Sequence, residues 1–195
     1  MVAWFLVVAS LLASTVAQAD QAESYPQTFS VAQTYNQKPF DYRIESHEEK
    51  AGMVVYRLTY PSPIVSPVKQ NNTIPAEYYV PKGIRADQAR RPAVICLHIL
   101  NGNYELERMC CTMLATHGVP AIMFKLPYYG ERALPGGRKA MAANPQLFAG
   151  ALTQGVEDVR RTVDLLASLG AREILLTGRG QGAWRVDGEH VGAAG

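Results

Sequence analysis

The residues best suited to chemistry occur in three segments, each directly after an apolar run of the sequence. The segments are Ile99-Leu100-Asn101-Gly102, Pro127-Tyr128-Tyr129-Gly130-Glu131-Arg132 and Gly178-Arg179-Gly180-Gln181-Gly182. If the apolar runs are parallel strands, the three segments lie at one edge of a sheet, where open α/β sheets bind their ligands. They therefore form the candidate functional site.

The glycines of the third segment match a dinucleotide-binding pattern. Gly178, Gly180 and Ala183 fit G-x-G-x-x-G/A directly after an apolar run, and a turn without Cβ atoms can press its backbone against a pyrophosphate at a helix N-terminus. This pattern belongs on the first strand of its unit, however, whereas two strand–helix units precede it here. The acidic residue expected about 20 residues later would fall beyond the last residue. Dinucleotide binding is therefore kept as an alternative.

Neither a metal site nor a disulfide framework is predicted. The three cysteines are Cys96, inside an apolar run, and the adjacent pair Cys110 and Cys111. An odd number leaves at least one thiol unpaired, and adjacent cysteines bridge only with strained geometry. Their spacing is not that of a metal site. We interpret all three as small buried side chains, and no cofactor is expected.

Strand and helix patterns alternate after residue 52. Segments rich in apolar, β-branched and aromatic residues predict five strands, at 53–60, 76–80, 93–98, 119–126 and 173–177. Apolar residues at helical spacing, each time followed by a glycine, predict helices at 104–117 and 147–169. This order requires right-handed crossovers and a mainly parallel sheet. The fold class is therefore α/β, a mainly parallel sheet flanked by helices, with an antiparallel lead-in.

The helical spacing also predicts which side of each helix is buried. In the segment 147–169 the apolar stripe is Val156, Val159, Val163, Leu166 and Leu169, with Glu157, Asp158, Arg160 and Arg161 outside. In the segment 104–117 the apolar positions are Leu106, Met109, Cys110, Met113 and Leu114. We expect both stripes to face the sheet.

The composition suits a globular protein and disfavours nucleic-acid binding. The chain has 195 residues, of which 48% are hydrophobic and 18% charged, as in an ordinary single domain rather than a disordered chain. Nineteen Lys and Arg against seventeen Asp and Glu give a net charge of +2. Because no basic run occurs, the chain lacks the electrostatic footprint of a protein that binds a phosphate backbone.

The N-terminus is predicted to be an export signal. Residues 1–19 carry no charged side chain and end in Ala17-Gln18-Ala19, a small-x-small pattern that signal peptidase accepts. The apolar run at 4–16 is shorter than the roughly 20 residues that span a bilayer. Cleavage near Ala19 would leave a periplasmic or extracellular chain without a membrane anchor. Residues 20–52 are polar without a sustained period and predict a flexible lead-in to a domain at 53–195.

Four runs together resemble the α/β-hydrolase superfamily. They are ICLHILNG at 95–102, FKLPYYGER at 124–132, DVRRTVDLLAS at 158–168 and the glycine-rich turn at 178–182. Within the superfamily they look most like the secreted bacterial branch related to dienelactone hydrolases and acetyl xylan esterases. The resemblance covers residues 53–182, and FKLPYYGER is its most specific part. It implies a small ester or an acylated carbohydrate as the substrate.

The resemblance also implies a role for each segment. In this family a Ser in a G-x-S-x-G elbow attacks the acyl carbon, a His takes its proton, and backbone N–H groups stabilise the oxyanion. Here Gly178, Gly180 and Gly182 occupy the elbow, and the N–H groups of Ile99 and Gln181 would form the oxyanion hole. Side chains at the loops of the cleft would be His98, Asn101, Tyr128, Tyr129 and Arg132. We interpret His98 as structural rather than as the general base.

The sequence departs from the family at the nucleophile. The Ser position is Gly180, which has no side chain to attack an acyl carbon. The acid and the His should follow after further strand–helix units, whereas Asp187, Glu189 and His190 lie only a few residues beyond the elbow. We therefore predict no catalytic residue, with ester hydrolysis as the activity of the relatives and not of this chain.

Two explanations of this departure stay open. The sequence is truncated or frame-shifted near or after Gly182, or Gly180 is genuine and the protein is a non-catalytic exported binding domain. In the second case Tyr128 and Tyr129 could stack on a sugar, although two loop tyrosines also suit ordinary packing.

Overall fold

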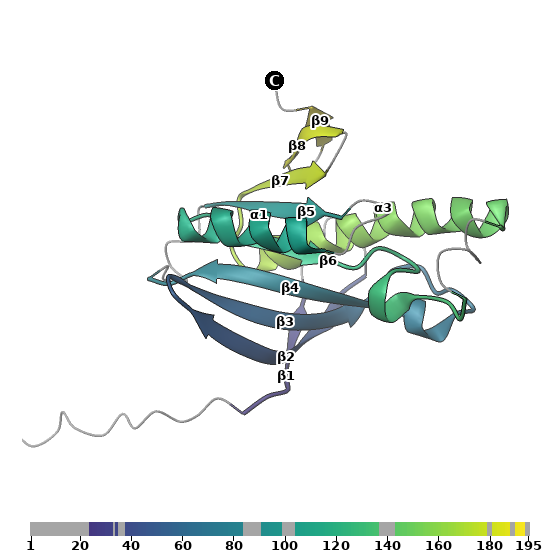
Figure 1. The fold of residues 1–195 in the computed structure, drawn as a ribbon, viewed down its shortest axis with the longest axis horizontal. Helices are drawn as coiled ribbons and strands as arrows, with labels where there is room; N and C mark the ends of the chain where they lie inside the picture. The colour runs from purple at the N-terminus through teal and green to yellow at the C-terminus, as the bar shows by residue number, and fades with distance from the viewer. Residues whose placement is uncertain are drawn as a thin grey trace, which may run out of the picture.

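The chain folds around a mixed sheet with a helix on each face (Figure 1). The structure is a computed structural model, and it describes residues 24–32, 34, 38–83, 91–98, 104–136, 143–178, 181–187 and 190–193. For residues 181–187 and 190–193 the backbone alone is described. The sheet order is β1-β2-β3-β4-β6-β5-β7-β8-β9. The predicted export signal at 1–19 lies outside the described residues. None of the described helices is long and apolar enough to cross a membrane.

The first four strands form an antiparallel meander. They are β1 (Gln27–Val31), β2 (Phe40–Lys50), β3 (Met53–Pro61) and β4 (Thr73–Pro81). Each pairs with the next in antiparallel register, and β4 then pairs antiparallel with β6. The strands predicted at 53–60 and 76–80 and the antiparallel lead-in are therefore confirmed.

The segment 20–52 is more ordered than the sequence analysis predicts, because β1 and β2 both lie within it. In β2, buried Phe40 and Tyr42 alternate with exposed Asp41 and Arg43, which is the period of a strand with one face on a core. Val31 of β1 is completely buried in the same core. The expectation of a flexible lead-in is corrected accordingly.

The parallel part of the sheet consists of three strands connected by two helices. They follow in the order β5 (Pro92–Leu97), α1 (Glu105–Thr116), β6 (Ala121–Phe124), α3 (Pro145–Ser168) and β7 (Glu173–Gly178). β5 lies between β6 and β7 and is parallel to both. The strands predicted at 93–98, 119–126 and 173–177 and both predicted helices are confirmed. Short 3-10 turns occur at η1 (Lys69–Asn72) and η3 (Gly130–Arg132).

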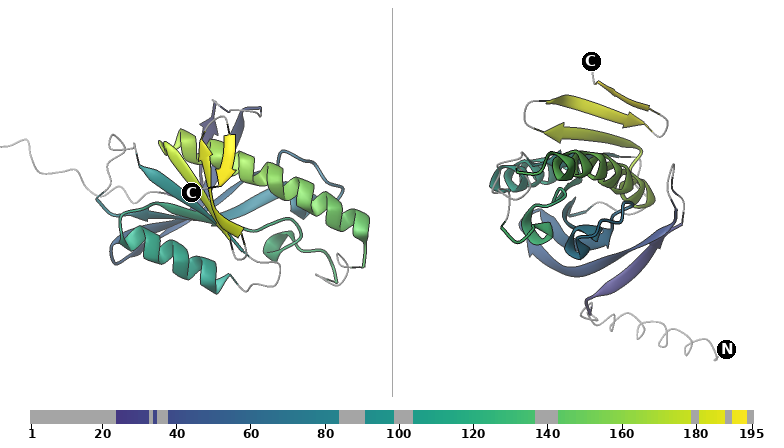
Figure 2. Two further views of the ribbon diagram at one scale, coloured as in Figure 1. Left: turned by 90° about the horizontal axis from the view of Figure 1, so that it is seen from above. Right: turned by 90° about the vertical axis from the view of Figure 1, so that its right-hand side faces the viewer.

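The two helices lie on opposite faces of the sheet (Figure 2). From β5 the chain moves to one neighbour, β6, and then returns across β5 to the other neighbour, β7. Right-handed crossovers in opposite directions place their helices on opposite faces. Side chains of β5 alternate between the two cores. Ala93 and Ile95 belong to the cluster with α3, while Val94 and Cys96 belong to the cluster with α1.

Val159, Val163 and Leu166 of the predicted stripe of α3 pack in the core as expected, but the buried side of the helix is wider than that stripe. Val156 is 54% exposed, whereas Asp158 is fully buried and Arg161 nearly so. The polar side chains are inside because each has a partner there. Asp158 is paired with Arg132, and the Arg161 guanidinium lies 4.3 Å from the centre of the Phe40 ring.

The buried side of α1 differs from the predicted stripe. Met109 and Met113 are more than half exposed, and Glu107, Cys111 and Ala115 are the buried positions. These three recur every four residues, so the helical period predicted for this segment is correct but its phase is not. All three cysteines are free thiols. Cys96 and Cys111 are buried as predicted, whereas Cys110 is only partly buried.

Beyond β7 the sheet returns to antiparallel pairing. The strands β8 (Gln181–Asp187) and β9 (His190–Ala193) extend it as a meander. The sheet is therefore mixed: its three parallel strands are those predicted, and antiparallel strands flank them on both sides.

Candidate functional site

His98 stands at the carboxyl end of β5, next to the first residues after β6. The backbone N–H of Leu126 donates a hydrogen bond to His98 Nε2 over 3.0 Å. The rings of Tyr104 and Tyr129 each pack edge-on against the imidazole, with centroids 4.9 Å away. The helices that follow β5 and β6, α1 and α3, lie on opposite faces of the sheet. The carboxyl ends of these two strands are therefore where an open α/β sheet forms its ligand-binding crevice.

The hydrogen bond fixes the tautomer of His98. Because Nε2 accepts from Leu126, the ring proton of neutral His98 is on Nδ1. The Nε2 lone pair is occupied, and only 4% of the residue is exposed. Taking a proton at Nε2 would break the bond and leave a buried N–H of the backbone unpaired. This geometry favours the structural interpretation of His98 over the general-base one.

The loop after β6 folds tightly over Lys125 and Tyr104. Gly130 has a φ of +56°, and a Cβ atom there would lie 3.3 Å from both Lys125 Cγ and Tyr104 Oη. Tyr104 and Tyr128 also adopt left-handed backbone conformations, with φ of 69° and 67°, which are uncommon for such residues. A larger residue at 130 would therefore be strained in its backbone and would displace the side chains of Lys125 and Tyr104 by a few tenths of an ångström.

Lys125 and Tyr104 are site residues that the sequence analysis missed. Lys125 Nζ lies 3.5 Å from the centre of the Tyr104 ring, and the residue is 5% exposed. Burial lowers the pKa of Lys125, and the nearby Glu77 and Glu131 carboxylates oppose this effect only in part. Lys125 is the one charged residue inside the apolar run 119–126, and this was the feature of the sequence that could have identified it.

Arg132 does not present its guanidinium to a ligand, because the side chain is completely buried in a polar network. Its Nη1 donates to Asp158 Oδ2 over 2.7 Å and to the Lys125 carbonyl over 2.9 Å, and its Nη2 donates to the Asn71 carbonyl over 2.6 Å. Burial raises the pKa of Asp158, although Arg132 and a hydrogen bond from Ser62 favour its carboxylate form. The network joins α3 to the β3–β4 connection and to the loop after β6.

Tyr128 and Tyr129 are packing residues. Each is 6% exposed, and together with Ala151 of α3 they form a small apolar cluster. The Tyr128 backbone N–H donates to Asn71 Oδ1 over 3.1 Å, which holds the loop in place. Their ring faces are therefore not available to stack on a sugar.

The glycine-rich turn joins two antiparallel strands. β7 ends at Gly178, β8 begins at Gln181, and these two residues are cross-strand partners. A nucleophile elbow is a strand-to-helix turn, and a pyrophosphate site also needs a helix N-terminus. Residues 181–187, which include Gln181 and Gly182, form a strand instead. Ile99, Asn101 and Gly180 lie outside the described residues, so the oxyanion-hole assignment to Ile99 and Gln181 stays a prediction.

The gathered residues offer a buried cation and aromatic rings but no nucleophile with an adjacent base. Among the described residues there is also no group of three or more His, Cys, Asp or Glu side chains placed to hold a metal ion.

The chain resembles solved structures in its fold, but it matches no known family by sequence. No family model and no curated protein matches the sequence. An acetyl xylan esterase from Paenibacillus sp. R4 matches with a TM-score of 0.52 and 20% identity, over 74% of this chain and 47% of its own. A cold-adapted esterase from an Arctic intertidal metagenomic library matches with 0.46 and 16%, over 68% and 53%. A Klebsiella pneumoniae protein described as a dienelactone hydrolase matches with 0.43 and 20%, over 66% and 50%.

The acetyl xylan esterase, at a TM-score of 0.52, shows that the chain has an α/β-hydrolase-like fold, which is the fold that the resemblance implies. The chain spans about half the length of the solved structures it matches.

Proposed function

We propose that this chain is related to serine-dependent carboxylic-ester hydrolases and that it does not itself catalyse acyl transfer. The sequence FKLPYYGER and the strand order β4-β6-β5-β7 support the relationship, together with the α/β-hydrolase-like fold. The substrate class of such relatives is a small ester or an acylated carbohydrate. One of the matched structures is named an acetyl xylan esterase.

Gly180 is the main reason to propose that the chain does not catalyse acyl transfer. It occupies the position of the serine in the glycine-rich turn after β7, and glycine cannot form an acyl-enzyme. Loss of the nucleophile of a catalytic triad costs about a millionfold in rate in a well-studied protease. The antiparallel strand after β7 supports the same conclusion, because the helix expected behind a nucleophile is replaced by β8.

Export to the periplasm or the cell exterior is part of the proposal. It is supported by the uncharged segment 1–19 and the Ala17-Gln18-Ala19 site. Within that compartment the chain would act as a binding domain.

A fluorophosphonate probe and an aryl acetate assay test the proposal on the purified full chain. We expect no covalent adduct by intact-mass measurement and no turnover above that of heat-denatured protein. Labelling of one site, abolished by heat, would overturn the non-catalytic assignment. Saturable binding of NAD in a titration would instead support the dinucleotide alternative.

A further inference from the structure

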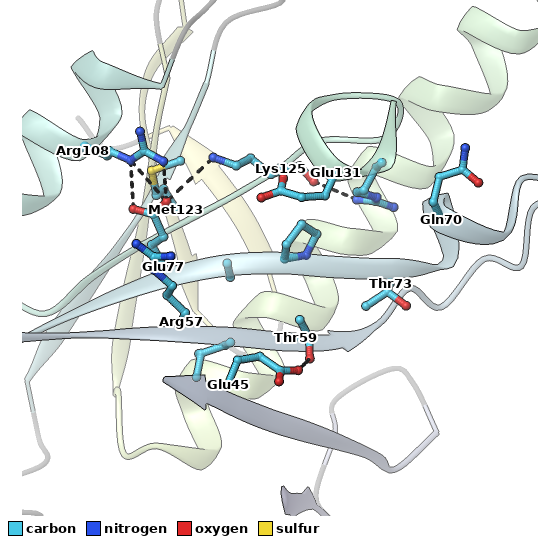
Figure 3. Close-up of a pocket in the computed structure, with 14 residues that line it drawn as sticks. Glu45, Arg57, Thr59, Gln70, Thr73, Glu77, Arg108, Met123, Lys125 and Glu131 are labelled. Atoms are coloured by element: carbon cyan, nitrogen blue, oxygen red, sulfur yellow. Dashed lines mark hydrogen bonds and ion pairs between the residues drawn. The ribbon is translucent and has the colours of Figure 1, made fainter. Parts of the chain in front are cut away.

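A pocket lies on the α1 face of the sheet, over β3 and β4 and beside the loop after β6 (Figure 3). Its volume is about 490 Å³, within the range of about 300–1,000 Å³ typical of small-molecule sites. Strand residues form the floor, Arg108 of α1 stands at one end, and Lys125 and Glu131 line the side formed by the loop. The proposed ester-hydrolase relationship assigns no role to this pocket.

Two buried side chains that line this pocket, Lys125 and Arg132, each have a nitrogen without a hydrogen-bond partner among the described residues. For Arg132 this is Nε alone, whereas the ammonium of Lys125 makes no hydrogen bond at all to those residues. Its Nζ is buried and has no hydrogen-bond acceptor within the described part of the chain. The closest carboxylate oxygen, Glu77 Oε1, is 3.9 Å away, beyond hydrogen-bond distance. An ammonium has three N–H donors, and leaving them unpaired away from water is costly. An acceptor oxygen of a ligand would supply what the protein does not.

Glu77 cannot fully compensate Lys125, because other groups already occupy its carboxylate. Arg108 donates from Nη2 to Oε1 over 2.7 Å and from Nε to Oε2 over 3.0 Å. The Tyr79 hydroxyl donates to Oε2 over 2.9 Å. These bonds lower the pKa of Glu77 against the opposing effect of its burial. Arg108 also donates from Nη1 to Glu105 Oε1 over 3.0 Å. Both oxygens of Glu77 are therefore bonded to other groups, and neither accepts a hydrogen bond from Lys125.

The other charged residues of the lining leave the pocket with a positive excess. Arg57, the cross-strand partner of Glu77, is exposed and makes no ion pair among the described residues. Glu131 is an exposed carboxylate in the loop after β6, near Lys125. Glu45 is the third carboxylate of the lining, so its four basic side chains (Arg57, Arg108, Lys125 and Arg132) outnumber its acidic ones (Glu45, Glu77 and Glu131) by one. The hydroxyl of Thr73 on β4 and the amide of Gln70 offer hydrogen bonds at the far end.

We propose that this pocket binds a small organic carboxylate that also carries hydroxyl groups, with the carboxylate held by Lys125 and Arg57. The charge excess calls for a monoanion, the unused donors of Lys125 call for an oxygen acceptor, and the volume suits a molecule the size of a monosaccharide acid. A bound carboxylate would stabilise the ammonium of Lys125 by direct hydrogen bonding.

Calorimetric titration of the full chain with gluconate tests the proposal, with glucose as the uncharged ligand of the same size. At low salt, where charges near the surface are least screened, gluconate is expected to bind saturably and about tenfold or more tightly than glucose. Saturable gluconate binding that glucose matches in affinity would overturn the role of the carboxylate. No saturable gluconate binding would overturn the site.

Three variants locate the binding. Lys125→Met is expected to weaken gluconate binding about tenfold or more, since the buried donor is lost. Arg57→Gln and Glu131→Gln change exposed side chains, so both should fold. The first is expected to weaken binding and the second to strengthen it, each about threefold. Arg160→Gln, the same change on the exposed side of α3, is the control and should bind as the wild type does. Unchanged binding in both Lys125→Met and Arg57→Gln would overturn the proposal.

Discussion

At the carboxyl ends of β5 and β6, single residues owe their roles to partners that are distant in sequence. His98 is an acceptor for Leu126, Arg132 is a donor to Asp158, and Lys125 faces Glu77. The sequence analysis predicted the structural role of His98 from its place beneath a loop. It could not predict the burial of Arg132 and Asp158, because each charge is stable inside only when the other is present.

The contribution of His98 can be measured by replacing it with an aromatic ring that cannot accept a hydrogen bond. His98→Phe would leave the Leu126 N–H unpaired in a largely buried position, so the free energy of unfolding is expected to fall by about 1–3 kcal/mol. Urea denaturation followed by circular dichroism measures the change. His47→Phe is the control, because His47 is exposed and stacks on aromatic neighbours that a Phe would retain. Equal stability of the two variants would contradict the structural role.

Among the elements, the parallel strands and both helices were predictable and the first two strands were not. The continuous apolar sequence PAVICL of β5 is typical of a strand that is buried on both faces of a sheet. β2 offers a weaker signal, since its alternation of Phe40, Tyr42 and Ile44 with charged residues is followed by the polar stretch 45–50. The phase of α1 and the full width of the buried side of α3 were missed, because charged side chains occupy part of both buried faces.

The place of β1 in the core leads to a second prediction. Val31 is completely buried, so Val31→Ala is expected to lower the free energy of unfolding by about 2 kcal/mol. Val65→Ala is the matched control, since Val65 is 82% exposed, and should change stability by less than about 0.5 kcal/mol. Urea denaturation of the three proteins compares them. If Val31→Ala were as stable as Val65→Ala, residues 20–52 would be a flexible lead-in after all.

At the scale of the whole molecule, the Arg132–Asp158 pair connects parts that the sheet itself does not join. Through Ser62, Asn71 and Gln154 the network reaches from α3 to the β3–β4 connection and to the loop after β6. The Tyr60 and Thr162 hydroxyls, 2.8 Å apart, add a further link between β3 and α3. No local sequence pattern encodes these contacts, whereas the α/β order of the elements follows from local patterns alone.

A double-mutant cycle tests this connection. Arg132→Met leaves a buried carboxylate unpaired and is expected to cost about 3–5 kcal/mol, while Arg132→Met with Asp158→Leu should cost clearly less than the sum of the single changes. The exposed pair Arg160 and Glu157 on the same helix is the control, with an expected coupling below about 1 kcal/mol. Thermal and urea unfolding measure both cycles. Additive effects at Arg132 and Asp158 would contradict the proposed coupling.

The position of β5 between β6 and β7 also affects how the chain folds as it is made. Both neighbours of β5 come later in the sequence, so β5 leaves the ribosome with neither edge covered. Its second edge is paired only when Gly178 has been synthesised, roughly 4–16 s after Leu97 at 5–20 residues per second. During that interval an apolar strand is exposed to other nascent chains.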